Sequence, residues 1–78
     1  MKRVAVLLAD GFEEVEGLTQ VDFLRRSGLE VSALGVTGKE ITGGHDIRVT
    51  TDGKVEDADE TYDAVVIPGG MPGAQYIA

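Results

Sequence analysis

The stretch VAVLLADGFEEVE, Val4 to Glu16, decides the fold of this chain. It opens with six apolar residues, Val4 to Ala9, a pattern typical of a strand that is covered on both faces in a parallel sheet. Asp10-Gly11 then predicts a turn, and three glutamates follow it within four positions. Ligands of open α/β sheets bind at the carboxyl ends of the strands, so we expect the chemistry at this turn.

The residues after the turn predict an amphipathic helix from about Glu13 to Ser27, with Gly28 just beyond its C-terminus. The apolar side of this helix is expected to carry residues three positions apart, widened by Phe23: Val15, Leu18, Val21 and Leu24. Leu29–Val36 predicts a second strand. Strand, helix and strand together indicate a βαβ unit with a right-handed crossover.

The second half of the chain predicts shorter elements. We expect short antiparallel strands at one edge of the sheet in Ile41–Thr51, one helical turn in Val55–Glu60, a buried strand at Ala64–Ile67, and a loop entering a helix in Met71–Ala78. Two buried strands need helices on both faces, and the sequence predicts one full helix. Residues 1–78 are therefore expected to be the incomplete N-terminal part of one domain, without an internal boundary.

Composition excludes several classes of protein. The net charge of −7 argues against a nucleic-acid or anionic-membrane partner. The 78 residues contain no cysteine and one histidine, so we expect no disulfide, no metal site and no cofactor. The apolar run near the N-terminus is six residues long, too short for a signal peptide or a membrane span, which makes a soluble cytoplasmic protein the default.

The glutamates after the turn, Glu13, Glu14 and Glu16, have two interpretations. All three could simply complement the helix dipole, at about 0.3–1 kcal/mol each, and periodicity alone favours this. Alternatively, Glu16 follows Val15 on the inner side of the helix, where partial burial would raise its pKa and suit it to general acid or base chemistry. Three carboxylates also argue against a phosphate at this helix N-terminus.

Gly69-Gly70, after Ile67-Pro68, ends the last predicted strand. Its backbone amides could form an anion nest or an oxyanion hole, or the glycines could serve only a sharp turn, and the sequence leaves both open. A phosphoacceptor domain that uses Asp10 would need a second acid at this strand end, where Pro68-Gly69-Gly70 stands instead. His45, the only imidazole, is expected to be an exposed loop residue.

Three stretches together resemble the N-terminal part of the ThiJ/PfpI superfamily, in its parkinsonism-associated deglycase branch. They are LLADGFEEVE at 7–16, VDFLRRSG at 21–28, and YDAVVIPGG at 62–70 with Gly73-Ala74. The resemblance implies a flavodoxin-like, class I glutamine amidotransferase-like three-layer α/β sandwich with a mostly parallel sheet, usually as a homodimer. It covers less than half of a typical member.

The resemblance also implies roles for particular residues. Glu16 would be the carboxylate that hydrogen-bonds the reactive cysteine, and Gly69 and Gly70 would line the oxyanion side of the site. Glu13 and Arg26 match positions near the site or the dimer interface.

The implied activity is cofactor-free glyoxalase or deglycase chemistry on small α-oxoaldehydes or their glycation adducts, with oxidation sensing or chaperone-like behaviour through the same cysteine as the alternative. The family's cysteine and its histidine lie beyond Ala78, and His45 does not match that histidine. We therefore expect this chain alone to be inactive. Its expected partners are a small carbonyl substrate, the C-terminal remainder of the domain and a second copy.

Overall fold

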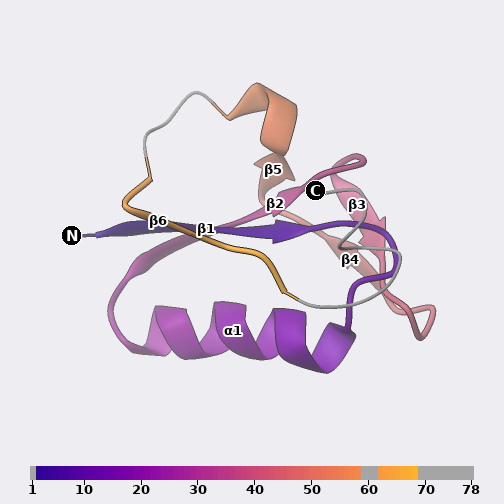
Figure 1. Cartoon of the computed structure of the whole chain (residues 1–78), viewed down its shortest axis with the longest axis horizontal. Helices are drawn as coiled ribbons and strands as arrows, with labels where there is room; N and C mark the ends of the chain where they lie inside the picture. The colour runs from indigo at the N-terminus through magenta and orange to yellow at the C-terminus, as the bar shows by residue number, and fades with distance from the viewer. Residues whose placement is uncertain (1, 59–61, 69–78) are drawn as a thin grey trace.

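The structure is a computed structural model that describes residues 2–58 and 62–68. The elements in chain order are β1 Arg3–Leu8, α1 Glu14–Arg26, β2 Glu30–Gly35, β3 Glu40–Thr42, β4 Arg48–Thr50, β5 Gly53–Lys54, the 3-10 turn η1 Val55–Asp57, and β6 Ala64–Val66. Within the described residues, the main sheet has four parallel strands in the order β5-β2-β1-β6, and α1 lies along one of its faces (Figure 1).

β1 is the central strand, because it pairs with β2 on one side and with β6 on the other. The chain passes from β1 through α1 to β2, and later returns to the opposite side of β1 to form β6. The strand order therefore reverses at β1. In open α/β sheets, ligands bind at such a switch point, at the carboxyl ends of the strands, which here is the position directly after Leu8.

The core lies between the sheet and α1. Val4, Val6 and Leu8 of β1 are 5%, 0% and 0% exposed and belong to one apolar cluster with Phe12 and Val21. The apolar run of the sequence therefore predicted β1 correctly. The predicted strand Leu29–Val36 is confirmed as β2, two residues shorter. Ala64–Ile67 is confirmed as the strand β6, one residue shorter, but its predicted burial is wrong within the described residues, because Val65 and Ile67 are exposed.

α1 is present with nearly the predicted bounds; its predicted inner side is confirmed at Val21 and Leu24 and wrong at Val15, Leu18 and Phe23. The buried helical residues are Glu14, Gly17 and Val21, whereas Val15 is 73% exposed and Phe23 67% exposed. Residues three apart step by 300° around a helix, so a period-three pattern drifts by about 60° at each step. The helix packs through positions 14, 17 and 21, with Leu24 partly buried against the cluster.

Two details of the second half differ from the prediction. The antiparallel strands are confirmed as β3 and β4, but they form a separate two-stranded sheet and not an edge of the main one. A strand that the sequence did not predict, β5, begins at Gly53 and pairs with β2 through Leu34 and Gly35. A two-residue strand is too short to produce an alternating sequence pattern, so pairing with β2 alone defines it.

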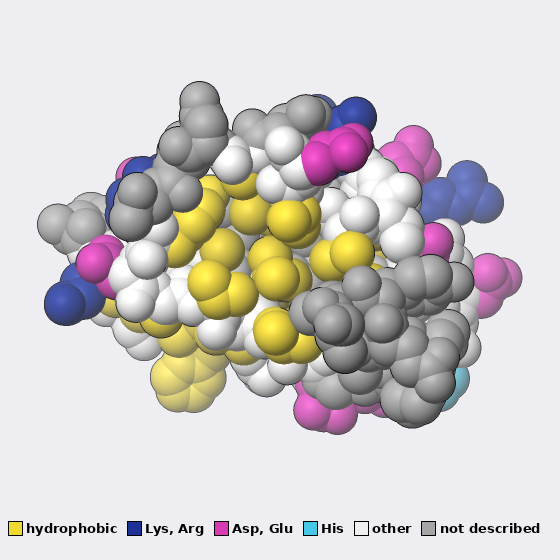
Figure 2. Space-filling view, turned by 45° about the horizontal axis from the view of Figure 1, so that its top comes forward, with side chains coloured by type: hydrophobic (Ala, Val, Ile, Leu, Met, Phe, Trp, Pro, Cys, Tyr) yellow, Lys and Arg dark blue, Asp and Glu magenta, His cyan; other side chains and the backbone are white. Residues whose placement is uncertain are grey.

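The face of the sheet away from α1 carries a group of hydrophobic side chains (Figure 2). Val65 of β6 pairs with Ala5, and both alternate with the residues that face α1, so Val65 points to this opposite face. Val65 and Ile67 are 56% and 52% exposed. α1, the one helix of eight or more residues in the described part, is neither long nor apolar enough to cross a membrane.

Gly17 lets α1 pack closely on the core, and this can be tested. A Cβ at Gly17 would lie 2.7 Å from Cδ2 of the Phe12 ring and 3.2 Å from Cδ2 of Leu8. Overpacking costs about 1–3 kcal/mol, more than the roughly 1 kcal/mol that alanine gains over glycine in a helix. We expect Gly17→Ala to lower the free energy of unfolding in urea, and exposed Thr19→Ala on the same helix not to. Equal stability of the two variants would contradict this packing.

Candidate functional site

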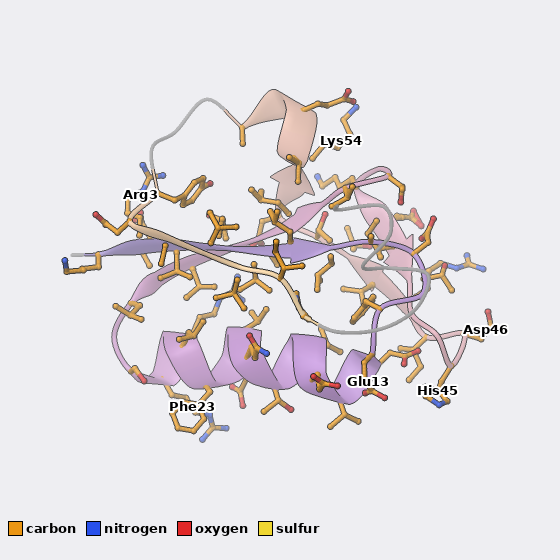
Figure 3. All side chains as sticks on the ribbon, viewed as in Figure 1. Arg3, Glu13, Phe23, His45, Asp46 and Lys54 are labelled. Carbon is orange, nitrogen blue, oxygen red and sulfur yellow. The ribbon has the colours of Figure 1, made fainter. Side chains whose placement is uncertain are left out.

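Three segments meet at the carboxyl end of β1: the turn that follows it, the first turn of α1, and the loop between β3 and β4, residues 43–47 (Figure 3). Two backbone hydrogen bonds join them. The Gly11 N–H donates to the Thr42 carbonyl at 2.8 Å, and the Gly44 N–H donates to the Phe12 carbonyl at 2.8 Å. Gly11 has a φ of +90°, which favours glycine at this turn.

Asp10 ties this turn to the neighbouring loops. Its Oδ1 accepts the Thr42 N–H at 3.0 Å, and its Oδ2 accepts the Thr37 hydroxyl at 3.1 Å. Both carboxylate oxygens therefore hold the polypeptide in place. This use of Asp10 agrees with the argument from sequence against a phosphoacceptor.

Glu13 is the N-cap of α1. Its backbone is extended, and its Oε1 accepts the N–H of Val15 at 2.7 Å and that of Glu16 at 3.4 Å. The first N–H groups of a helix have no partner within the helix, so this carboxylate satisfies two of them and also complements the dipole. For Glu13, the capping and dipole interpretation is the one that its contacts support.

Glu14 is the buried carboxylate of the site, with only 4% of its surface exposed. Its Oε2 accepts the His45 N–H at 2.6 Å and the Ile47 N–H at 3.4 Å, and its Oε1 lies 2.9 Å from Nδ1 of the His45 ring. A Cβ at Gly43 would overlap the Glu14 carboxyl group. The loop is therefore shaped around this side chain.

These contacts set the ionisation of both partners. Burial raises the pKa of Glu14, but the His45 ring and the backbone N–H groups of Glu14, His45 and Ile47 outweigh it and lower the pKa to about 2. The hydrogen bond to Glu14, followed by the negative charges of Glu14 and Glu13, raises the pKa of His45, against a smaller effect of desolvation. The pair favours a carboxylate beside an imidazolium. The His45 side chain is 74% exposed, as the sequence predicted for a loop residue.

Glu16 is exposed, so the predicted partial burial of its side chain is wrong. The reason is the helix phase, which places Val15 and Glu16 on the outer side and Glu14 and Gly17 on the inner side. Within residues 2–58 and 62–68, no hydrogen bond or ion pair involves the Glu16 carboxylate. Its role in chemistry stays a prediction.

The remaining predicted site residues do not join this cluster. Gly69 and Gly70 lie outside the described residues. Arg26 is at the other end of α1 from Glu13, where its Nε pairs with Oδ1 of Asp22 at 3.0 Å in an exposed i,i+4 contact. Among the described residues, no group of three or more histidine, aspartate or glutamate side chains could hold a metal ion.

Comparison with known proteins identifies the class. The model of the DJ-1/PfpI family matches residues 2–78. The chain therefore belongs to the DJ-1/PfpI family, which confirms the resemblance drawn from its motifs.

Particular relatives agree with this assignment. The chain is 40% identical over 80 residues to the Parkinson disease protein 7 homolog of Danio rerio, an alignment that covers 99% of this chain and 42% of the relative. It is 36% identical over 75 residues to protein dj-1beta of Drosophila melanogaster, covering 94% of this chain and 40% of that one. The chain thus spans about two fifths of the length of these relatives.

Solved structures show the same fold. A cysteine-to-alanine mutant of a DJ-1 superfamily protein from Salmonella typhimurium superposes with a TM-score of 0.94 at 40% identity, covering 100% of this chain and 43% of that one. Oxidized Toxoplasma gondii DJ-1 superposes with a TM-score of 0.93 at 36% identity, covering 97% and 42%. The predicted flavodoxin-like α/β fold with a mostly parallel sheet is confirmed.

Sequence reasoning missed the Glu14–His45 pair, because a buried glutamate at the inner side of a helix contradicts the apolar pattern on which the prediction relied. One signal was available. Gly43-Gly44 directly precedes the only histidine, and adjacent glycines mark places where another group approaches the backbone closely.

The N-cap role of Glu13 gives a stability prediction. Replacing a capping side chain with alanine costs about 0.5–2 kcal/mol, so we expect Glu13→Ala to lower the free energy of unfolding by about 1 kcal/mol. Glu16→Ala, on the same turn but without a cap contact, is the matched control and should change it by less than about half that amount. Urea denaturation of both variants measures the difference. A larger loss in Glu16→Ala would contradict this division of roles.

Proposed function

We propose that this chain is the N-terminal part of a cysteine-dependent enzyme that acts on small α-oxoaldehydes or their glycation adducts, and that Glu16 assists a cysteine from polypeptide outside residues 1–78. Membership of the DJ-1/PfpI family supports the proposal. The Salmonella typhimurium relative whose structure is known as a cysteine-to-alanine mutant carries a cysteine in its natural sequence.

The observation that carries the proposal is that Glu13, Glu14 and Glu16 differ in their contacts and exposure. The Glu13 carboxylate caps α1, and the Glu14 carboxylate is enclosed by the Gly43–Ile47 loop. Glu16 lies on the same opening turn, at the carboxyl edge of the sheet, with an exposed carboxylate that the described residues do not engage. It is therefore the acid of this turn that can meet a reactive group supplied from elsewhere.

In the proposed reaction, the cysteine thiolate attacks the aldehyde carbon of the substrate, and a carbon–sulfur bond forms as the carbonyl π electrons move to oxygen. Glu16, as the acid–base group, receives the thiol proton and returns it to the developing alkoxide. The amides of Gly69 and Gly70 are proposed to stabilise that oxygen while it is negatively charged.

The proposed partners follow from the exposed surfaces. The hydrophobic face of the sheet around Val65 and Ile67 suits the C-terminal remainder of the domain, which would complete a third layer (Figure 2). Val15 is exposed on the outer side of α1, as is Phe23 (Figure 3), and both suit a second copy. A cytoplasmic location and independence from cofactors, nucleic acid and membranes remain predictions.

Turnover of methylglyoxal by the complete protein tests the enzymatic proposal. Because a positioned acid–base group contributes about 10²–10⁴-fold, we expect Glu16→Gln to lower kcat by at least about 100-fold while the protein stays folded. Glu40→Gln, an exposed carboxylate on β3, is the control and should retain the wild-type rate. Wild-type turnover in Glu16→Gln would exclude the role of Glu16.

A second function, oxidation sensing or chaperone-like behaviour through the same cysteine, is favoured by one comparison. A structural neighbour at TM-score 0.93 is a DJ-1 protein in an oxidized form. A cysteine sulfinate carries negative charge on oxygen, and we propose that Glu16 and the amides of Gly69 and Gly70 surround it.

Mass spectrometry distinguishes this function from the first. After mild peroxide treatment of the complete protein, a sensor should gain two oxygens at one cysteine, and Glu16→Ala should gain fewer or should oxidise further. Unmodified cysteine together with intact methylglyoxal turnover would favour the enzyme over the sensor.

A further inference from the structure

We propose that Glu14 and His45 form a proton-sensitive latch that fastens the β3–β4 loop, residues 43–47, to the first turn of α1. The latch does not depend on the proposed function. Its two halves come from segments 31 residues apart in the sequence, and three nitrogen atoms of the loop meet one buried carboxylate.

The geometry allows one half to respond to solvent while the other does not. The Glu14 side chain is 5% exposed and the His45 side chain 74% exposed. The imidazole therefore exchanges protons directly with water, while the carboxylate that it contacts is shielded from water. A buried carboxylate that loses a donor keeps its desolvation cost, so the partner's proton matters more here than in a surface ion pair.

Within residues 2–58 and 62–68, few other hydrogen bonds hold the loop in place. Its internal bonds, from the Gly43 N–H to the Ile47 carbonyl and from the Asp46 N–H to the Gly43 carbonyl, close the loop on itself. Among the described residues, the hydrogen bonds from the loop to the β1–α1 region are one from the Gly44 N–H to the Phe12 carbonyl and those that converge on Glu14. Weakening the Glu14 contact should therefore loosen the loop locally and leave the sheet intact.

The charges around the ring favour its protonated form. Glu14 and Glu13, at the start of α1, both act on His45. Asp46 leaves the loop in a different direction from the ring (Figure 3). Asp10 is bound to Thr37 and Thr42, and Arg48 is exposed at the start of β4.

The direction of the response follows from the two pKa shifts. The pKa of His45 is raised above its ordinary 6.5, so its contribution is complete below about pH 6.5 and is lost as pH rises through the folded-state value. The pKa of Glu14 is lowered from 4.5 to about 2, so its contribution is complete above about pH 4.5 and is lost as pH falls toward 2. Both contributions are therefore complete between about pH 4.5 and about pH 6.5. When the pH rises from this range through the folded-state pKa of His45, the contribution of His45 is lost and the latch weakens.

Amide hydrogen exchange of the loop in the purified protein tests this, measured at about pH 5.5 and about pH 8.5 and corrected for the intrinsic pH dependence of exchange. We expect the His45 and Ile47 amides to lose protection at the higher pH, by up to about tenfold for each unit by which the pKa of His45 exceeds 6.5. His45→Gln keeps a side-chain donor but does not titrate, so its corrected protection should be the same at both pH values. Unchanged protection in the wild type, or the wild-type response in His45→Gln, would overturn the latch.

A titration of the His45 imidazole by NMR gives an independent measurement, with the resonance assigned by its absence in His45→Gln. The pKa should lie above 6.5 in the wild type and in Glu16→Gln, the matched control on the same turn. It should fall toward 6.5 in Glu14→Gln. If Glu14→Gln does not fold, the proposal is still tested by the wild-type titration, with His45→Gln used to assign the resonance. An ordinary pKa for His45 in the folded wild type would overturn the proposal.

Discussion

A buried carboxylate needs hydrogen-bond donors in place of water. The Glu14 carboxylate imposes that requirement on the structure at the carboxyl end of β1. Burying an isolated ionised carboxylate costs many kcal/mol, so the fold needs N–H groups at this place. The β3–β4 loop supplies them from His45 and Ile47, and glycine at position 43 leaves room for the carboxyl group. One side chain at the start of α1 thus accounts for the conformation of a loop about thirty residues away.

The same requirement explains why α1 sits as it does. With Glu14 turned inward to its donors, the helix must bury position 17, where glycine allows contact with the Phe12 ring, and position 21, where valine joins the core. Val15 and Glu16 are then carried to the outer side. The exposure of Glu16 is therefore a consequence of the burial of Glu14.

The sequence predicted the elements well and the helix phase poorly, for reasons that can be named. The apolar run Val4–Ala9 predicts a buried strand, and Val4, Ala5, Val6 and Leu8 of β1 are buried. The spacing of Val15, Leu18 and Val21 was compatible with several helix orientations, and contacts distant in the sequence selected one that hydrophobicity does not favour. β5 has two residues and is defined by its pairing with Leu34 and Gly35, which no local pattern encodes.

In the candidate site, too, local sequence predicts some features, and contacts between residues distant in the sequence decide the others. Motifs placed the acids at the correct edge of the sheet, because the end of a buried strand followed by a turn is a local feature. The role of each acid depends on its hydrogen-bond partners. A capping carboxylate needs N–H groups of its own helix, and a buried carboxylate needs N–H groups of the β3–β4 loop. A carboxylate that acts on a third group must be bound by neither. Glu13 meets the first condition and Glu14 the second, and Glu16 is exposed on the same turn. Among the described residues Glu16 is engaged by neither its own helix nor the loop, and the proposed role in a site completed by further polypeptide requires this condition.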